Sequence, residues 1–367
     1  MKAPLVNKPI KKLNGSEIYD PFTKGLSLMR LFKFIKQNSK IMNTKSEIMR
    51  MLISATCSCM LLLLSSCIKE DMSNCPEEIR IYFQIPTPEG GTEINPLDVD
   101  MMHLYVFDKK GYYLGEYHDE YIPDFKEDEY FIDCSDLLPA QYRFIAWAGK
   151  DERFYATEPG LFVKGKTLFE DALLMLQHPN NIVSEEIHHL FYSDLSATVT
   201  VEKVQRFDMP LLQQTNTIRI HTVGFPADVD VYTFNIADNN CSYLFDHSFA
   251  DLSRAGVSNS EFTYTAPCEK DAGSQIRSKL NVMRLSGERH TPQLQIFNQT
   301  TGKLLYPADN NSGDLIELIK SFYPENNFDA VHIYDIVLTC VDPDEPTAFT
   351  VTILINGWVV SDQEDNI

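Results

Sequence analysis

The chain has 367 residues, of which 52 are acidic and 32 basic, so its formal net charge is −20 at neutral pH. A chain this acidic excludes binding to nucleic acid through phosphate contacts, which requires clustered lysine and arginine side chains. Hydrophobic residues make up 44% of the sequence, which is enough for two ordinary cores.

Residues 1–41 are basic and precede a segment that has the pattern of a signal peptide. Lys45 and Arg50 stand before an uncharged stretch of about 14 residues, which would be about 21 Å long as a helix. This length is too short for a bilayer core of about 30 Å but is typical of a signal peptide. We therefore expect a signal peptide at 42–66, with translation starting at Met42 or Met49. Residues 1–41 are then a gene-model extension, and the alternative is a genuine basic amphipathic segment.

The end of the apolar stretch, Leu64-Ser65-Ser66-Cys67, resembles the lipobox of bacterial lipoproteins. In a lipobox the cysteine thiol receives a diacylglyceryl group, and cleavage leaves this cysteine as the first residue. Two or three acyl chains, each burying CH₂ groups worth about 0.8 kcal/mol, make such an anchor effectively permanent. We therefore expect a mature chain at 67–367 that is held in the outer membrane by acyl chains on Cys67.

The next residues, Lys69-Glu70-Asp71, resemble the surface-export signal of Bacteroidota lipoproteins. The alternative is a solvated, charged tether without a sorting role. The match predicts that the lipid-anchored protein is exposed on the cell surface.

Most of the mature chain alternates apolar and polar residues with a period of two, which indicates half-buried strands. Ile79, Ile81 and Phe83, for example, alternate with polar or aromatic neighbours. Similar segments lie at 102–108, 112–117, 141–148, 196–204, 216–225, 230–236, 261–266, 281–285, 292–298, 331–341 and 348–360.

Two short helices interrupt the predicted strands. Thr167 and Glu170 have the spacing of a capping box and Pro179 follows, so we expect a helix over 167–179. Residues 313–324 form an amphipathic pattern that predicts a second helix. Short strands with turn signals between them favour β-sandwiches, and we expect an all-β fold with two sandwich domains, at 67–195 and 196–367, each with a short helical insertion.

Five cysteines follow Cys67, and an oxidising export route permits disulfides between them. Pairs of Cys75 with Cys134 and of Cys241 with Cys268 would give one bond in each half, although spacing does not fix the connectivity. No C-x-x-C spacing is present, so the cysteines do not suggest a metal site.

Several motifs together resemble the FimB-type fimbrillin-associated anchor proteins. The segment 71–76, "DMSNCP", resembles their D-x-S-x-C-P opening. Trp147-Ala148-Gly149 resemble the end of their L-x-x-G-x-Y-x-x-x-x-W-A-G strand, although this chain has Ala140 where glycine is common in the family. The segments 104–117, 188–195 and 353–360 also match. The resemblance spans the mature chain.

This resemblance implies an outer-membrane lipoprotein of two transthyretin-like β-sandwich domains that holds the base of a type V fimbrium. Its implied partners are the fimbrillin, accessory fimbrial subunits and the outer membrane, and it implies no cofactor. Subunits of such fibres assemble by β-augmentation, in which main-chain hydrogen bonds supply the affinity. The final strand, at 349–360, is a candidate for this contact, and an ordinary core strand is the alternative.

Motifs for catalysis or metal binding are weak. His188 and His189 are adjacent, so on a strand they would point to opposite faces and would not share one ion. The segment 309–314 loosely resembles a calcium loop but has Lys320 where the twelfth ligand would be glutamate. The sequence therefore predicts no catalytic residue, no metal site and no enzyme.

Two other non-enzymatic functions stay open: a fimbrial tip subunit or adhesin, and a surface glycan-binding lipoprotein that uses Trp147 and Trp358 as stacking platforms. Fimbrial subunits of this kind are expected to lose an N-terminal strand by cleavage after a basic residue. Arg80 and Arg143 both lie inside predicted strands, which favours retention of the lipid and the anchor function.

Overall fold

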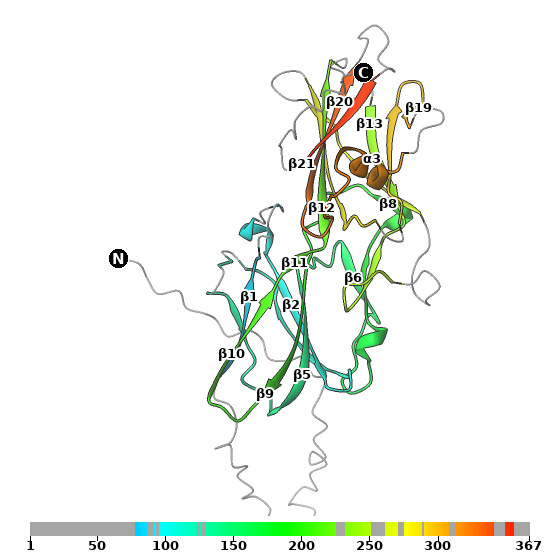
Figure 1. Ribbon diagram of the computed structural model, residues 1–367. Helices are drawn as coiled ribbons and strands as arrows, with labels where there is room; N and C mark the ends of the chain where they lie inside the picture. Colours follow the sequence, from blue (N-terminus) through cyan, green and yellow to red (C-terminus); the bar gives the residue numbers. More distant parts are fainter. Residues whose placement is uncertain are drawn as a thin grey trace, which may run out of the picture. The chain divides into compact units, whose positions relative to one another are not determined.

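The computed structural model describes the chain from residue 78 to residue 355 with several gaps (Figure 1). Strands dominate this part of the chain, and α3 (Leu315–Phe322) is the α-helix described within it. The prediction of a fold built mostly from β-strands is confirmed. The described ranges are 78–86, 92, 95–122, 125–126, 129–224, 232–250, 261–270, 275–287, 290–307, 313–340 and 349–355.

The first pair of sheets contains a three-stranded and a five-stranded sheet. In the smaller sheet β1 (Glu78–Gln84) is central, with β10 (Val204–Pro210) parallel on one side and β4 (Phe131–Asp133) antiparallel on the other. The larger sheet has the order β11 (Leu212–Gln213), β9 (Phe191–Val199), β5 (Ala140–Ala148), β2 (Met102–Asp108) and β3 (Tyr113–Asp119).

The two sheets of this pair enclose one hydrophobic core. Ile79, Ile81 and Phe83 alternate along β1 and are fully buried, and they belong to the same cluster as Leu104 of β2 and Phe144 of β5. Burial of each such side chain stabilises the fold by about 1.5–3 kcal/mol. The period-two pattern of the sequence therefore places one face of β1 in this core.

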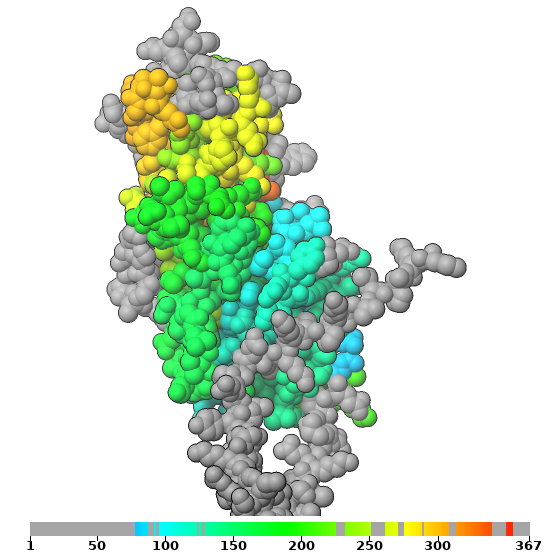
Figure 2. Space-filling model, turned by 180° about the vertical axis from the view of Figure 1, so that it is seen from behind, coloured from blue at the N-terminus to red at the C-terminus, as the bar shows by residue number. Residues whose placement is uncertain are grey.

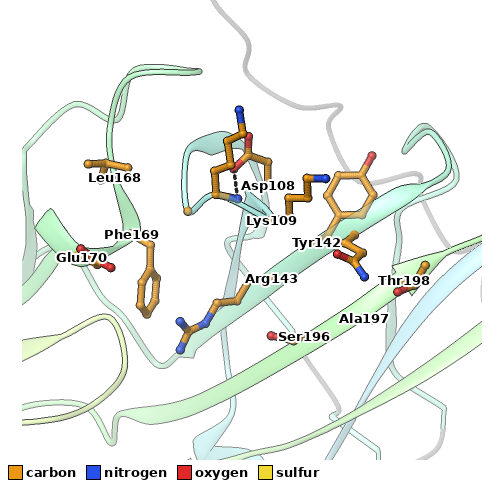
Figure 3. A pocket seen from close by; sticks show the side chains of 13 residues that line it. Asp108, Lys109, Tyr142, Arg143, Leu168, Phe169, Glu170, Ser196, Ala197 and Thr198 are labelled. Carbon is orange, nitrogen blue, oxygen red and sulfur yellow. Dashed lines mark hydrogen bonds between the residues drawn. The ribbon is translucent and has the colours of Figure 1, made fainter.

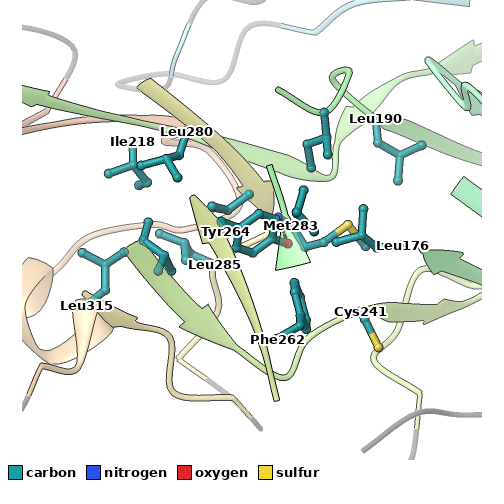
Figure 4. Packing of buried hydrophobic residues seen from close by; sticks show 14 of the residues in the cluster. Leu176, Leu190, Ile218, Cys241, Phe262, Tyr264, Leu280, Met283, Leu285 and Leu315 are labelled. Atoms are coloured by element: carbon teal, nitrogen blue, oxygen red, sulfur yellow. Dashed lines mark hydrogen bonds between the residues drawn. The ribbon is translucent and has the colours of Figure 1, made fainter. Parts of the chain in front are cut away.

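The second pair consists of two five-stranded sheets. Its core contains Ile218, Tyr264, Leu280 and Met283, and Leu315 of α3 packs into the same cluster (Figure 4). One sheet has the order β16 (Glu269–Lys270), β17 (Ile276–Met283), β12 (Thr215–Val223), β20 (Ile333–Cys340) and β21 (Phe349–Ile355). The other has the order β19 (Lys303–Tyr306), β18 (Gln293–Asn298), β13 (Tyr232–Asp238), β15 (Phe262–Ala266) and β8 (Ile182–Val183).

A fifth, small sheet joins segments that are distant in the sequence. It has the order β14 (Ser242–Leu244), β7 (Leu173–Leu176) and β6 (Tyr155–Glu158). Seen from behind, the green surface of the middle of the chain adjoins both the cyan surface of the early strands and the yellow surface of later ones (Figure 2). The segment between β5 and β9 therefore packs against strands from both halves of the sequence.

The two helix predictions have different outcomes. Residues 315–322 form α3, and Asp314 caps it by accepting hydrogen bonds from the amides of Ile316 and Glu317 at 2.8 and 3.1 Å. The predicted helix at 167–179 is wrong, because this segment contains only the short 3₁₀ turn η4 (Phe169–Asp171) before β7.

The sequence predicts a join between two domains at residues 195 and 196. Strand β9 runs through this position, and β10 and β11 still belong to the first pair of sheets. Apart from the two-residue strand β8, the strands of the second pair begin with β12 at Thr215. The division into domains at 67–195 and 196–367 stays a prediction.

Gly149 ends strand β5 with a backbone that requires glycine. Its φ is +70°, and a Cβ atom there would lie 1.8 Å from the carbonyl oxygen of His189. A side chain at this position would force the two backbones apart. The W-A-G pattern at 147–149 therefore has a steric cause.

Candidate functional site

The predicted lipid end of the protein lies outside the described residues. This applies to the lipobox, to Cys67, to Lys69, Glu70 and Asp71, and to the segments 1–41 and 42–66. Among the residues that the structure describes, no helix has the length and apolar character needed to cross a bilayer. The described chain starts at Glu78, whose amide donates to the carbonyl oxygen of Lys203 at 2.8 Å.

The predicted disulfide between Cys241 and Cys268 does not form in the structure, where both residues are thiols. Cys241 and Cys268 are not bonded to each other, and the Sγ of Cys268 donates to the carbonyl oxygen of Tyr232 at 3.3 Å. The predicted bond between them is therefore absent from the structure. Cys134 is also a thiol, and its burial raises its pKa. Its predicted partner Cys75 lies outside the described ranges, so that pairing stays a prediction.

Strand β1 is held firmly on both sides. Its amides and carbonyls pair with β10 and β4, and the Nε of Arg80 lies 2.6 Å from a carboxylate oxygen of Glu78. The guanidinium of Arg80 also stacks 4.4 Å from the ring centroid of Phe131. Arg143 lies inside β5. Both arginines are therefore within paired strands, as predicted.

Strand β10 is an edge strand with several features that discourage pairing with another chain. Arg206 lies 2.8 Å from Asp208, and its guanidinium stacks 4.0 Å from the ring centroid of Tyr82. Pro210 ends the strand and has no amide proton to donate. Charges and prolines on an edge strand are common means of preventing unwanted strand addition.

Strand β21 is the edge strand of the sheet that contains β20. It pairs antiparallel with β20 over all seven of its residues, from Phe349 to Ile355, and the described chain contains no strand on its other side. Its sequence, "FTVTILI", has no charge and no proline. Ile353 is buried and Thr350 and Thr352 are exposed, so the strand packs by one face.

The remaining edge strands within the described ranges are short or polar. β8, β11 and β16 have two residues each, β4 and β14 have three, β6 has four, and β19 begins with an exposed lysine, Lys303. β3 carries Glu116 and His118 and has a register irregularity opposite β2. β21 therefore combines the length and the uncharged composition that strand addition requires.

A polar pocket of about 530 Å³ opens beside the start of β5 (Figure 3). Figure 3 shows Arg143 extending toward the ring of Phe169, and its guanidinium lies 3.7 Å from the ring centroid. The same guanidinium binds both carboxylate oxygens of Asp194, at 3.1 and 2.5 Å. Gln141 and Thr198 also line the pocket. These groups can donate hydrogen bonds to a polar ligand.

The adjacent histidines lie in a loop and not on a strand, so the predicted alternation of their side chains does not apply. The Nδ1 of His188 lies 3.4 Å from Asp100, and the Nε2 of His189 lies 3.9 Å from Asp98. Burial lowers the pKa of His189 and favours its neutral form. Within the described ranges, no group of three or more His, Cys, Asp or Glu side chains is placed to hold a metal ion.

Trp147 is fully buried, so it cannot serve as the stacking platform of the alternative glycan-binding function. Its ring packs 5.0 Å from that of Tyr192, measured between centroids. Trp358 lies outside the described residues. β5 is buried on both faces from Phe144 to Ala148, so its alternation does not distinguish Trp147 from a surface residue.

Comparison with known proteins gives a consistent result. A family model described as fimbrillin-A associated anchor proteins Mfa1 and Mfa2 matches residues 72–364. The minor fimbrium anchoring subunit Mfa2 of Porphyromonas gingivalis is 23% identical over 316 residues, which cover 82% of this chain and 91% of that protein.

Solved structures share the fold. The fimbrial anchor protein Mfa2 from Porphyromonas gingivalis has a TM-score of 0.58 and 21% identity, over 77% of this chain and 98% of that one. A candidate polysaccharide-binding protein from Bacteroides thetaiotaomicron has a TM-score of 0.61 and 21% identity, over 80% and 100%. A candidate adhesin from Bacteroides ovatus has a TM-score of 0.62 and 18% identity, over 78% and 97%. Identities this low establish the common fold alone.

Proposed function

Because the chain belongs to the family of fimbrillin-A associated anchor proteins, we propose that a lipid on Cys67 and a strand contact at β21 together hold a fimbrium to the outer membrane. The chain is a fimbrial anchor protein, and this family is not one of enzymes. The observation that carries the proposal is the match of the family model to residues 72–364. The two pairs of sheets are then transthyretin-like β-sandwich domains.

The membrane end rests on the sequence before β1. The lipobox at 64–67 places the acyl chains eleven positions before Glu78, the first described residue of β1. β1 is paired on both sides, which supports retention of this strand, and therefore of the lipid, in the mature protein. The residues at 69–71 are proposed to direct the protein to the cell surface.

The fimbrial end rests on the edge of the β20–β21 pair. A strand from a fimbrillin or an accessory subunit would add to the outer side of β21 and satisfy its main-chain groups. The charged pair Arg206–Asp208 and Pro210 make β10 a less favourable edge for the addition of a strand from another subunit. β21 is therefore the proposed site of fibre contact.

The lipid is tested by Cys67→Ser in the host cell. Without the thiol no diacylglyceryl group is attached, so we expect fimbriae to leave the cells and accumulate in the spent medium. Electron microscopy of cells and medium measures this. Cys268→Ser is the control, because a hydroxyl can still donate to the carbonyl of Tyr232 and the variant should retain its fimbriae. Full retention in the Cys67 variant would refute the lipid anchor.

The strand contact is tested by the double substitution Thr350→Lys and Thr352→Lys. Both residues are exposed, so two charges on β21 should leave the fold stable within about 0.5 kcal/mol while they oppose strand addition. We expect shed fimbriae although the anchor stays on the membrane. The control is Ser196→Lys with Thr198→Lys, which are two exposed positions on β9, in a different sheet, and which test whether added charges alone cause shedding. Equal retention in both variants would move the contact to another edge.

A further inference from the structure

Three exposed apolar side chains gather at one end of the first pair of sheets. Leu138 is 63% exposed, Val201 is 58% exposed and Val204 is 63% exposed. The register of β5 with β9 pairs Ala140 with Val199, so Leu138, two residues before β5, and Val201, two residues after β9, adjoin the same end of this sheet. These three residues are called the apolar tip below.

The chain enters the fold at the same end. The register of β1 with β10 places Glu78 beside Val204, and the Glu78 amide bonds to the neighbouring Lys203 carbonyl. Eleven residue steps separate Glu78 from Cys67, and a fully extended chain spans at most about 3.3–3.6 Å per residue, or about 40 Å in all. A lipid on Cys67 therefore keeps the apolar tip within this distance of the membrane.

Ordered turns hold the apolar tip in its exposed position. The side chain of Gln205 accepts from the Thr200 amide at 2.9 Å and donates to the carbonyls of Thr200 and Glu202, both at 3.2 Å. These bonds close the turn that carries Val201. On the neighbouring loop, the hydroxyl of Tyr142 donates to the Leu138 carbonyl at 2.7 Å. The exposure of these apolar groups is therefore a feature of well-bonded turns.

Three lysines stand near the apolar tip, and one of them, Lys203, lies beside the exposed Glu202 between Val201 and Val204. The register pairs Asp108 with Tyr142, which brings the turn between β2 and β3 to the start of β5, and this turn carries the exposed Lys109 and Lys110. β1, β10 and β5 all begin at this end, in the lower part of Figure 1. Apolar groups beside lysines are typical of surfaces that rest on anionic lipid headgroups.

We propose that the apolar tip, formed by Leu138, Val201 and Val204, docks on the lipid surface of the outer membrane, with Lys109 and Lys110 facing anionic headgroups. This inference rests on the proposed lipid on Cys67, which brings the tip to the membrane. The docking fixes the orientation of the anchor, so that strands β1 and β10 rise away from the bilayer.

The test uses the mature protein, purified from host membranes, in vesicles of phosphatidylethanolamine and phosphatidylglycerol whose acyl chains carry bromine. Leu138→Trp is compared with Leu97→Trp, because Leu97 is 67% exposed and lies at the other end of the same pair of sheets, before β2 begins. Bromine quenches tryptophan only at close range, and the fluorescence of Trp147 and Trp358 is subtracted with the unsubstituted protein. Val201→Trp repeats the measurement in case the Leu138 variant does not fold.

We expect loss of the introduced fluorescence in the Leu138 and Val201 variants and none in the Leu97 variant. Equal quenching at both ends, or none at either in protein that floats with the vesicles, overturns the docking but leaves the lipid anchor intact. Unquenched but blue-shifted emission at position 138 would instead show that the tether or a second copy covers the tip. Protein that does not float overturns the lipid on Cys67 and the docking with it.

Discussion

Strands β10 and β21 both lie at the edge of a sheet, but they differ in what they offer to a neighbouring chain. β10 carries the Arg206–Asp208 pair and ends in Pro210. β21 has neither charge nor proline over its seven residues. Each strand also contributes a buried side chain, so both belong to a core. Within the described residues, β10 therefore carries edge protection that β21, in the second pair of sheets, lacks.

The largest expected effect comes from removing the core contact of each edge strand. Met209 of β10 is 0% exposed and Ile353 of β21 is 1% exposed. Met209→Ala and Ile353→Ala should each lower the free energy of unfolding by about 2–5 kcal/mol, because each leaves a cavity. Chemical denaturation measures this. A loss well below this range for Ile353→Ala alone would mean that β21 is weakly packed. It would contradict the statement that both edge strands belong to a core.

Acid should lower the free energy of unfolding through protonation of His332, which directly precedes β20. Burial lowers the pKa of His332 from 6.5 to about 4, against a smaller opposing effect of Asp329. Above pH 6.5 the histidine is neutral in both the folded and the unfolded chain, so no stability is lost to its protonation. As the pH falls from 6.5 toward 4, the unfolded chain binds a proton that the folded chain does not, and up to about 3 kcal/mol is lost.

Denaturation midpoints between pH 7 and pH 4 measure this loss. His332→Gln is the control, because its backbone bonds to Thr92 and Thr217 are unchanged while the titrating group is removed. The variant should lose less stability than the parent over this range. Parallel curves for the two proteins would assign the acid sensitivity to other groups.

The smallest expected effect concerns Arg206, whose contacts with Asp208 and Tyr82 lie on the edge strand β10. Arg206→Ala removes the ion pair with Asp208 and the stacking on Tyr82, which together are worth about 1 kcal/mol at a half-exposed position. Arg206→Lys keeps the charge and should recover part of this loss. Chemical denaturation at low and high salt separates the two contributions. A salt-independent loss would assign the whole effect to the stacking.

Period-two alternation predicts most strands correctly, and β1 is a clear case because one of its faces is buried and the other is not. The segment 167–179 misleads for a physical reason. Leu173, Leu174 and Leu176 are all buried, so β7 has no alternation, and a short apolar run does not distinguish a strand from a helix. Its pairing partner β14 lies about 70 residues further along the chain, and such pairing leaves no local signal.

The candidate sites divide in the same way. The amphipathic pattern of α3 is local, so the sequence predicts this helix correctly. The edge position of β21 depends on its place beside β20, and the protection of β10 depends on parallel pairing with β1. The apolar tip depends on the registers of two sheets, which bring Leu138 near Val201. These features arise from long-range pairing, which a single sequence does not specify.

The central position of β1 has a mechanical consequence. With the proposed lipid on Cys67, the tension from a fibre that is pulled by flow would enter the fold at Glu78, at the start of β1. Force along the strand axis loads the hydrogen bonds to β10 and β4 in shear, so they must break together, whereas a strand peeled from an edge loses them one at a time. Because forced unfolding is governed by the rate of unfolding, this arrangement gives the attachment a long lifetime under load.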